Sequence, residues 1–227
     1  MAWRSTGGSN SELINNLYQN GMIDSAKVKD AMLGVDRAHY APQTPYVDSP
    51  QPIGHSATIS APHMHASAAT SLLNHLKPGS HVLDIGSGSG YLTHVLAEIV
   101  KPNGQVVGVE HIQPLVDLGR ENMQKSAEGR ELLANGTVKF VKADGRLGYK
   151  ELAPYDAIHV GAAAKELHPK LIEQLKAPGR MFIPVEEGFL QHIYVIDKAE
   201  DGTVEKKRQY SVQYVPLTDP PKHGQED

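Results

Sequence analysis

The residues best suited to bind a ligand lie at 81–90 (HVLDIGSGSG), where a short apolar stretch ends in three glycines. Glycine lets the backbone turn tightly around a ligand and place it at a helix N-terminus. The spacing here is G-x-G-x-G, whereas a dinucleotide-binding turn requires G-x-G-x-x-G, and Tyr91 occupies the place of its third glycine. Asp84 favours a cationic group and would repel a pyrophosphate. The run therefore predicts a strand, a turn and a helix that bind a nucleotide-like cofactor carrying positive charge.

Acidic and small residues follow the next expected strands. Glu110 stands 20 residues after Gly90, where a carboxylate can accept hydrogen bonds from ribose hydroxyls. Asp144-Gly145 suits the adenine edge, and 161–164 (GAAA) leaves room for a ligand. Singly, Glu110 could be a solvated strand end and Asp144-Gly145 an ordinary turn. Their occurrence at successive strand ends favours a nucleotide-like cofactor, with NAD as an alternative because Glu110 also fits its ribose.

The composition restricts the class of protein. A chain of 227 residues with 40% hydrophobic and 21% charged residues suits one globular domain. The net charge of −4 argues against a nucleic-acid partner, and no apolar run is long enough to span a bilayer. With no cysteine, the chain offers no disulfide, thiolate nucleophile or cysteine metal site. The N-terminus lacks the apolar segment of a secretory signal, so we expect a cytosolic protein.

Hydrophobic periodicity predicts helices before residue 78 and alternating strands and helices after it. Ser9 and Glu12 form a capping box, Asp24 is expected to cap a second helix, and the five-proline stretch 41–62 is expected to be a long loop. A third helix is expected from Met64 onward. Helices are also expected at 92–99 and 167–175, and strands at 81–85, 105–109, 138–142, 156–160, 180–185, 191–197 and 209–215.

This alternation predicts an α/β fold, a doubly wound and mostly parallel sheet of about seven strands with helices on both faces. Asp201-Gly202 predicts an antiparallel hairpin at the sheet edge. We expect a single domain over 1–227. Residues 1–78 would form N-terminal helices and a substrate loop, 79–219 a cofactor-binding core and 220–227 a loose tail.

Five segments together resemble one family. The pattern D-x-G-x-G-x-G of Asp84 to Gly90 resembles the first motif of S-adenosylmethionine-dependent (class I, Rossmann-like) methyltransferases. With it, the chain resembles animal-type protein-L-isoaspartate (D-aspartate) O-methyltransferases in the following segments: 53–66 (IGHSATISAPHMHA), 84–90 (DIGSGSG), 155–164 (YDAIHVGAAA), 179–185 (GRMFIPV) and 214–219 (YVPLTD).

The resemblance implies a reaction. Such an enzyme transfers a methyl group from S-adenosylmethionine to the free α-carboxylate of L-isoaspartyl residues, and of some D-aspartyl residues, in damaged proteins and peptides. The ester then closes to a succinimide, which starts repair, and the cofactor leaves as S-adenosylhomocysteine. The ordinary pKa of a carboxyl group is about 4, so the acceptor is already ionised at pH 7 and needs no general base. The resemblance also implies a monomer without nucleic-acid or membrane partners.

The resemblance also implies the site residues. Ser60 would orient the acceptor carboxylate, whereas from the residues alone it would more simply cap the helix that begins near His63. His63-x-His65 offers too few ligands for a metal, so no metal is expected. His55 departs from the aromatic residue expected there. The implied cofactor residues are Ala57, Thr58, Ile59, Ser60, His65, Asp84, Ile85, Gly86, Ser87, Gly88, Glu110, His111, Asp144, Gly145 and Thr218, and the substrate residues are Ile53, Gly54, His55, Val215, Pro216 and Leu217.

Other functions share parts of this pattern. A nicotinamide oxidoreductase would keep the fold but change the glycine turn. Small-molecule O-methyltransferases share the first motif without requiring the loop Thr58-Ile59-Ser60. Nucleic-acid methyltransferases usually carry an Asn/Asp-Pro-Pro-aromatic run after the fourth strand, where this chain has 161–164 (GAAA). A non-catalytic cofactor-binding module would lack part of the motif set that is present here.

Overall fold

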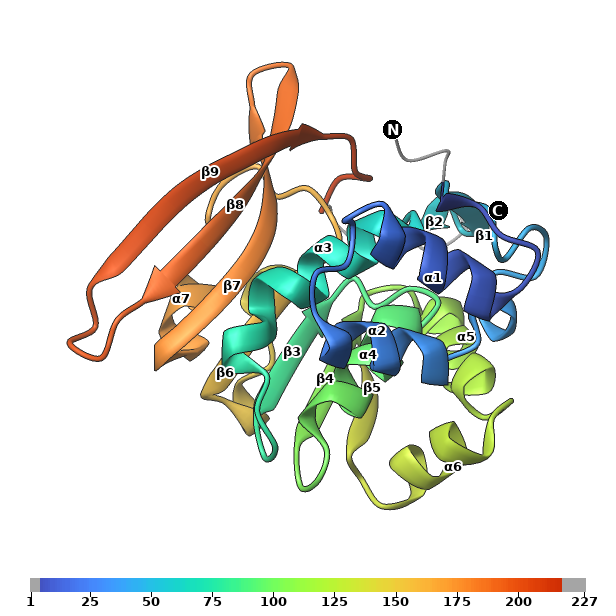
Figure 1. Cartoon of the computed structure of the whole chain (residues 1–227). Helices are drawn as coiled ribbons and strands as arrows, with labels where there is room; N and C mark the ends of the chain where they lie inside the picture. The colour runs from blue at the N-terminus through green and yellow to red at the C-terminus, as the bar shows by residue number, and fades with distance from the viewer. Residues whose placement is uncertain (1–4, 218–227) are drawn as a thin grey trace.

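The computed structural model describes residues 5–217 of the chain (Figure 1). The helices are α1 (Asn10–Gln19), α2 (Ala26–Gly34), α3 (Pro62–Leu72), α4 (Tyr91–Val100), α5 (Gln113–Met123), α6 (Ala127–Ala134) and α7 (Pro169–Gln174). The strands are β1 (Gln51–Gly54), β2 (Ala57–Ile59), β3 (His81–Ile85), β4 (Gln105–Glu110), β5 (Val138–Lys142), β6 (Tyr155–Val160), β7 (Leu175–Glu187), β8 (Leu190–Lys198) and β9 (Val204–Val212).

Seven strands form one sheet in the order β5-β4-β3-β6-β7-β8-β9. The strands from β5 to β7 are parallel, and β8 and β9 run antiparallel to their neighbours. The strand order reverses between β3 and β6, and ligands of such sheets bind beyond the carboxyl ends of the strands at this switch point. The mostly parallel seven-stranded sheet and the edge hairpin are confirmed, and the glycine turn after β3 lies at the switch point.

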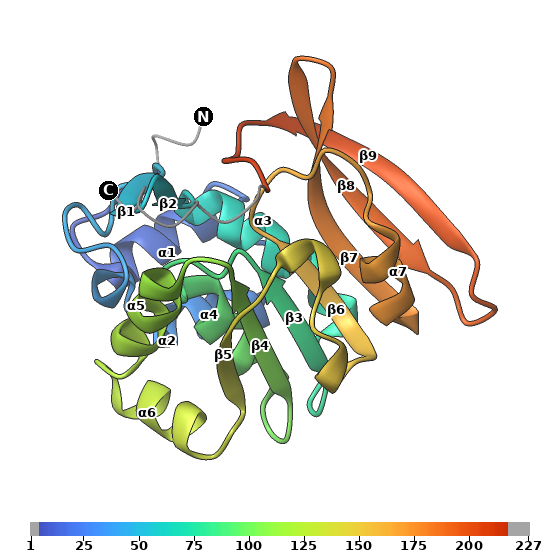
Figure 2. The same ribbon diagram turned by 180° about the vertical axis from the view of Figure 1, so that it is seen from behind.

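Side chains alternate between two apolar layers. Val82, Val106 and Phe182 join the core that α1 to α6 cover, whereas Leu83, Val107 and Met181 join a second core on the opposite face. The second face is covered only by α7 and short 3-10 turns within the described residues, so helices lie on both faces but unequally. From behind, β3, β4 and β6 are directly in view, with α7 beside β7 (Figure 2).

The N-terminal helices form largely as expected. Ser9 caps α1 by accepting a hydrogen bond from the Glu12 backbone amide at 3.2 Å. The Asn10 side chain donates to the Met32 carbonyl at 3.1 Å, which ties α1 to the end of α2. The expected Asp24 cap is wrong, because Ser25 is the N-cap of α2 and makes no side-chain capping bond.

Several element boundaries differ from the sequence prediction. Residues 41–62 are not only a loop, because β1 and β2 pair as an antiparallel hairpin within them. The last strand ends at Val212 and not at 215. The helix expected at 167–175 is only the short α7, since Leu175 already pairs with Tyr155 in the sheet. The prolines of the 41–62 segment predicted a loop, but the segment contains a hairpin. The turn of this hairpin takes His55 and Ser56 to φ of 50° and 54°.

Gly90 is the glycine whose replacement should cost most stability. Its φ is +82°, and a Cβ there would lie 2.9 Å from Phe140 Cζ and 3.0 Å from the Gly119 carbonyl oxygen. Left-handed backbone and overpacking each cost about 1–3 kcal/mol, so Gly90→Ala should lower the free energy of unfolding by about 2–4 kcal/mol. Denaturant unfolding of the cofactor-free protein measures this. Gly136→Ala is the control, because Gly136 has φ +77° with no atom within 4 Å, and equal losses would contradict the steric argument.

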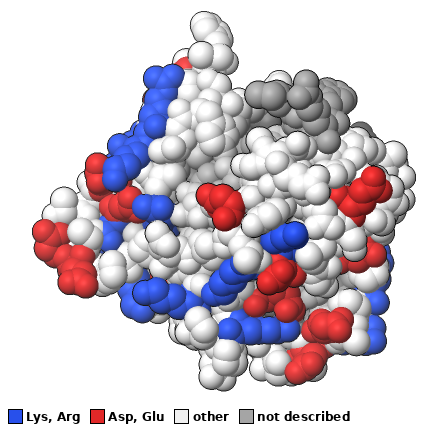
Figure 3. Space-filling view, in the orientation of Figure 1, with Lys and Arg blue, Asp and Glu red and all other residues white. Residues whose placement is uncertain are grey.

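The edge strand β9 carries charge along most of its length. Its residues are exposed from Val204 to Ser211, and Lys206, Lys207 and Arg208 lie in the middle of the strand. Lys207 pairs with Glu205 at 2.9 Å, and the Lys206 ammonium lies 3.8 Å from the centre of the Tyr194 ring. Blue side chains accordingly lie along the upper left edge of the molecule in Figure 3, with red side chains next to them. No helix among residues 5–217 has the length and apolarity needed to cross a membrane.

Candidate active site

The glycine turn after β3 has the backbone shape that its sequence predicts. Gly86, Gly88 and Gly90 have φ of 72°, 48° and 82°, a region that other residues rarely adopt. The Gly86 amide donates to the Val109 carbonyl at 2.8 Å, and the Gly161 amide donates to the Ile85 carbonyl at 2.7 Å. These bonds fix the turn between the ends of β4 and β6, where a ligand can approach main-chain atoms closely.

Asp84 is a buried carboxylate at the end of β3, with a relative exposure of 1%. It accepts hydrogen bonds from Thr93 Oγ1 at 2.5 Å and His159 Nδ1 at 2.8 Å. The His159 ring stacks on Phe182, with ring centres 5.9 Å apart. Two donors from α4 and β6 therefore fix the carboxylate beside the glycine turn. The sequence indicated Asp84 but not Thr93, and it placed His159 only in a small-residue run.

Glu110 ends β4 and holds the glycine turn through the backbone. Its Oε2 accepts from the Gly88 amide at 3.3 Å, and its Oε1 accepts from the His111 and Ile112 amides at 2.7 and 3.3 Å. A carboxylate oxygen can accept about two hydrogen bonds, so Oε2 keeps capacity for a further donor. The structure thus places Glu110 against Gly88, as expected from the strand ends.

Asp144-Gly145 follows β5 at the same edge. Asp144 accepts from Arg146 Nη2 at 2.7 Å, and this hydrogen bond, ahead of the opposing effect of burial, lowers the pKa of the carboxyl. A Cβ at Gly145 would lie 2.3 Å from Ile85 Cγ2 and 3.6 Å from Leu217 Cδ1. Gly145, Ile85 and Leu217 therefore meet, which joins an expected substrate residue to expected cofactor residues. Thr218 lies outside the described residues.

Ser60 lies between β2 and α3, and the Arg37 guanidinium anchors its main chain. Its carbonyl accepts from Arg37 Nη2 at 2.8 Å, and Tyr214 lines the large cavity beside it. Burial raises the pKa of the Tyr214 phenol, so this phenol is neutral at pH 7. Ser60 does not cap α3, because Ala61 is the N-cap and makes no side-chain bond there. The simpler structural role for Ser60 is therefore wrong, and its hydroxyl is directed toward the cavities described next.

A narrow cavity joins the Ser60 loop to the glycine turn. It is lined by Thr58, Ile59, Ser60, His65, Asp84, Gly86, Ser87, Gly88, Ser89, Leu92, His159 and Gly161. Eight of these are residues expected to bind the cofactor. Ala57, Ile85, His111, Asp144 and Gly145 do not line this cavity, and Glu110 reaches it only through Gly88. The Ser60 loop and the strand ends thus meet as expected.

A second, larger cavity of about 730 Å³ opens on the other side of Ser60. Thr58, Ser60 and Gly161 line both cavities. The remaining lining comes from the α1–α2 turn, from Pro50 before β1, from the start and body of α3, and from β9 with the segment after it. These residues are Gly21, Met22, Asp24, Pro50, Ala61, His63, Met64, Ser67, Thr70, Ser71, Tyr210, Ser211, Val212, Gln213, Tyr214 and Val215. A cavity large enough for several residues of peptide therefore adjoins the narrow cavity.

The expected substrate residues separate into two positions. Val215 lines the large cavity, and Pro216 pairs with Ala163. Ile53 instead covers the glycine turn, since a Cβ on Gly88 would lie 3.2 Å from Ile53 Cδ1. Gly54 and His55 form the tip of the β1–β2 hairpin and do not line the cavity.

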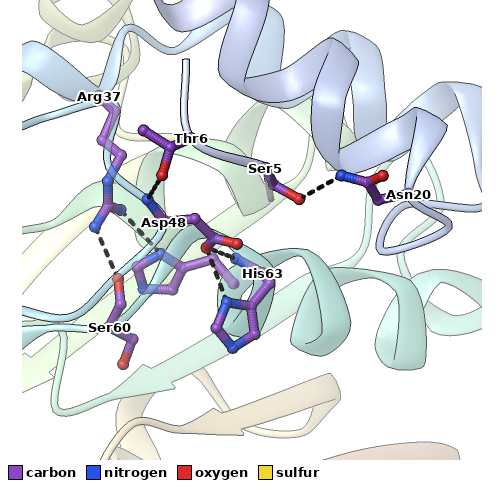
Figure 4. A network of polar contacts seen from close by, with 8 residues as sticks. Ser5, Thr6, Asn20, Arg37, Asp48, Ser60 and His63 are labelled. Atoms are coloured by element: carbon purple, nitrogen blue, oxygen red, sulfur yellow. Dashed lines mark hydrogen bonds and ion pairs between the residues drawn. The ribbon is translucent and has the colours of Figure 1, made fainter. Parts of the chain in front are cut away.

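His63 and His65 have separate partners and do not form a ligand pair. His63 Nδ1 bonds Asp48 Oδ1 at 2.8 Å, and the His63 amide donates to the same oxygen at 3.1 Å (Figure 4). His65 Nδ1 instead faces Arg37 Nη1 at 3.3 Å. In the described part of the chain, no group of three His, Cys, Asp or Glu residues could hold a metal ion.

Sequence reasoning missed Arg37, which contacts both Ser60 and His65, and Tyr91 as a wall beside them. The His65 and Tyr91 rings lie 5.1 Å apart, and the Arg37 guanidinium lies 5.2 Å from the Tyr91 ring centre. Arg37 carries no signal in the sequence, because a single arginine before a proline-rich segment is ordinarily a surface residue.

Comparison with known proteins agrees with this geometry. The family model "Protein-L-isoaspartate(D-aspartate) O-methyltransferase (PCMT)" matches residues 8–222. A protein-L-isoaspartate O-methyltransferase of Caenorhabditis elegans is 51% identical over 219 residues, covering 96% of each chain, and one of Triticum aestivum is 51% identical, covering 92% of this chain and 91% of its own.

A solved structure described as a putative Plasmodium falciparum protein-L-isoaspartate O-methyltransferase, in complex with S-adenosyl-L-homocysteine, has a TM-score of 0.87 at 38% identity. The match covers 93% of this chain and 99% of that one. The family match spans both cavities and the Ser60 loop between them. The chain therefore belongs to the protein-L-isoaspartate (D-aspartate) O-methyltransferase family, and its activity is that of a protein-L-isoaspartate O-methyltransferase.

Proposed function

We propose that Ser60 is where this enzyme brings the methyl group of S-adenosylmethionine and the free α-carboxylate of an L-isoaspartyl or D-aspartyl residue together. One observation carries the proposal: the narrow cavity at the glycine turn and the large cavity meet at Thr58, Ser60 and Gly161. The cofactor supplies a methyl group on a cationic sulfonium. The acceptor is a carboxylate already ionised at pH 7. The protein therefore has to align and desolvate the two reactants, and it does not have to remove a proton.

The narrow cavity has a volume of only about 30 Å³, so it would take one part of the cofactor, and its charges and acceptors suit the sulfonium end. The buried Asp84 carboxylate places negative charge at the end of β3, which favours a sulfonium. Glu110 keeps an acceptor site for ribose hydroxyls. Asp144 and Gly145, with His111, lie where the adenine edge would follow, and residues 57–60 with His65 would close over the methionine part.

Ser60 acts on the acceptor in this scheme. Its hydroxyl donates a hydrogen bond to one carboxylate oxygen and leaves the other oxygen directed at the methyl group. Transfer joins a carboxylate oxygen to the methyl carbon as the carbon–sulfur bond breaks, so an anion and a cation are both neutralised. A site with little water favours this loss of charge over separated, hydrated reactants.

The large cavity has the length and polarity of a groove for an extended peptide. One wall is the face of α3 that carries Met64, Ser67 and Ser71, and the opposite wall is β9 with the segment that follows it. Pro62 and Ser71 are nine residues apart, which is about 14 Å along α3. That length matches about four residues of extended chain. The substrate would run along this groove, held mainly by its backbone.

The end of β9 offers that backbone a partner. β9 is the last strand of the sheet, so one of its edges has no neighbouring strand among residues 5–217. Tyr210 on β9 hydrogen-bonds Ser67 on α3, which links the two walls. The Thr70 hydroxyl is buried in this groove without a hydrogen-bond partner, and a peptide amide or carbonyl could satisfy it. Recognition through the backbone fits an enzyme that accepts many protein sequences.

Filling the far end of this groove should affect long acceptors only. In Ser71→Trp, KM for an isoaspartyl peptide of about nine residues should rise about tenfold, because one or two hydrogen bonds of about 1 kcal/mol each are lost. KM for an isoaspartyl tripeptide should stay unchanged. Steady-state kinetics on both peptides measure this, with Ser11→Trp on exposed α1 as the control. Equal effects on the two peptides would show that the substrate does not follow α3.

We also propose that the enzyme is a cytosolic monomer with no nucleic-acid or membrane partner. The net charge of −4 and the absence of cysteine support this.

Transfer of labelled methyl from S-adenosylmethionine to a pair of peptides tests the function directly. The two peptides differ only in one residue, isoaspartyl in the first and normal aspartyl in the second. Label should enter the isoaspartyl peptide alone and should be released by mild base as the ester closes. Equal labelling of both, or labelling of neither, would overturn the proposed substrate.

A further inference from the structure

Arg37 is a fully buried guanidinium, with a relative exposure of 0%. Its Nη2 donates to the Ser60 carbonyl at 2.8 Å and its Nη1 faces His65 Nδ1 at 3.3 Å (Figure 4). Its Nε has no hydrogen-bond partner. Within residues 5–217, no carboxylate lies within ion-pair distance of it. A charged group in this setting is costly unless its surroundings use the charge or the donors.

The charge of Arg37 persists despite its burial. Desolvation lowers its pKa to about 10, opposed by the electrostatic effects of Tyr91 and then Asp48. The group is therefore protonated at pH 7. An arginine can only donate hydrogen bonds, so each polar atom that it contacts must act as an acceptor.

His65 is the first residue that this rule constrains. Because Nδ1 must accept from Arg37, the ring proton of neutral His65 resides on Nε2. Burial lowers the pKa of His65 well below 6.5, and the neighbouring Arg37 charge lowers it further. His65 is thus neutral at pH 7, and its Nε2–H is a donor on the wall of the narrow cavity that also holds Asp84.

Ser60 is the second residue that a hydrogen bond from Arg37 constrains. The bond from Arg37 reaches its carbonyl and not its hydroxyl, so Arg37 fixes the main chain without occupying the side chain. Ser60 stands between β2 and α3 without a capping bond to the helix. Arg37 is consequently a strong polar anchor of the loop at the point where the two cavities meet.

We propose that Arg37 is a positioning residue whose single guanidinium orients both the residue for the acceptor and the residue for the cofactor. It holds Ser60 in place for the acceptor and holds His65 as the Nε2–H tautomer toward the cofactor. The inference rests on the proposed function for the roles of Ser60 and His65, while the tautomer itself is a property of the protein alone. Loss of Arg37 should therefore affect turnover and the protonation site of His65 together.

The tautomer is measured by nitrogen-15 NMR of the histidine side chains, with His65 assigned by comparison with His65→Gln. The wild-type spectrum should show His65 protonated at Nε2. In Arg37→Gln the amide oxygen can accept from Nδ1–H, so the Nδ1–H form should appear. A wild-type His65 protonated at Nδ1 overturns the inference, and this measurement does not require any Arg37 variant to fold.

Kinetics supply the second measurement. A displacement of about 1 Å can cost about 100-fold in rate, so kcat of Arg37→Gln on an isoaspartyl tripeptide should fall by about 100-fold. Arg37→Lys keeps one donor and the charge, and should recover part of that loss. Arg180→Gln is the matched control, because Arg180 Nη1 also donates to a carbonyl, that of Ser71, at 3.0 Å, away from the cofactor cavity.

The possible outcomes separate the inference from the proposed function. If the wild-type protein does not methylate the isoaspartyl peptide, the proposed function fails, and the NMR result still decides the tautomer. If the wild type is active but Arg37→Gln keeps its kcat, the positioning role is overturned. A loss of kcat in Arg180→Gln equal to that in Arg37→Gln would show general destabilisation and would also overturn it.

Discussion

Replacing Ser60 with alanine should lower kcat for an isoaspartyl peptide by about 100-fold, the usual cost of removing one well-placed donor. The affinity for S-adenosylmethionine should change by less than about threefold, because alanine keeps the main-chain carbonyl that binds Arg37. Ser60 lines both cavities, so its hydroxyl acts where the two reactants meet. Steady-state kinetics and calorimetric titration of the cofactor measure the two quantities separately.

Ser126→Ala is the control for Ser60→Ala, since the same hydroxyl is removed far from the site. Ser126 caps α6 by accepting from the Gly129 amide at 2.9 Å, so its loss should cost about 1 kcal/mol of stability and leave kcat unchanged. An unchanged kcat in Ser60→Ala would rule out the orienting role. A loss of cofactor affinity as large as the loss of kcat would place Ser60 in cofactor binding instead.

Asp84→Asn should weaken binding of S-adenosylmethionine by at least about tenfold, or about 1.4 kcal/mol. The carboxylate is 1% exposed and lies at the carboxyl end of β3, so water hardly screens its charge. The amide keeps the shape of the group but not the charge. Titration with S-adenosylhomocysteine, whose sulfur is uncharged, isolates the charge effect, because that affinity should fall much less.

Thr93→Val separates the charge of Asp84 from its positioning. The variant removes the 2.5 Å hydrogen bond to Asp84 and keeps the carboxyl group itself. We expect its affinities for the two ligands to fall together and by less than about tenfold, since one hydrogen bond is lost and the carboxyl group remains. If Asp84→Asn lowered both affinities equally, the charge of Asp84 would have no part in recognising the sulfonium.

The sequence predicts the parts of the fold that local patterns encode. β3 and β5 begin and end where the alternation of apolar residues places them, because a buried strand needs an unbroken apolar face. The glycine turn was predictable for a similar reason, since Gly86 and Gly88 adopt φ values that few other residues tolerate. The same turn identified Asp84 and Glu110, which stand at fixed places relative to the strand ends.

The element boundaries that the sequence misplaced depend on contacts between distant segments. β9 is exposed from Val204 to Ser211, so it has no alternating pattern, and its pairing with β8 decides that it starts at Val204 and not at 209. The helix before β7 ends early because the Gln174 side chain bonds the Tyr149 amide and the Leu147 carbonyl, which lie over 20 residues away.

Arg37 shows the same limit for the site. Its three neighbours, Ser60, His65 and Tyr91, stand between 23 and 54 residues later in the chain. No short-range spacing links an arginine to them, and its complete burial appears only when the Ser60 loop, α3 and α4 come together around it. The resemblance of the Ser60 loop to the family identified Ser60, which we propose faces the substrate, but not Arg37, which holds its main chain.

The charged edge of β9 has a consequence for handling damaged proteins. Aged polypeptides expose strands with unpaired backbone groups, and such strands add readily to any open sheet edge and begin aggregates. Lys206, Lys207 and Arg208 make most of this edge a poor template, because a second strand would have to accommodate three cations. Only the uncharged end from Tyr210 to Val215 opens into the groove. In the proposed groove the enzyme can thus bind a short segment of a damaged protein for one methyl transfer, while the charged part of β9 does not template its aggregation.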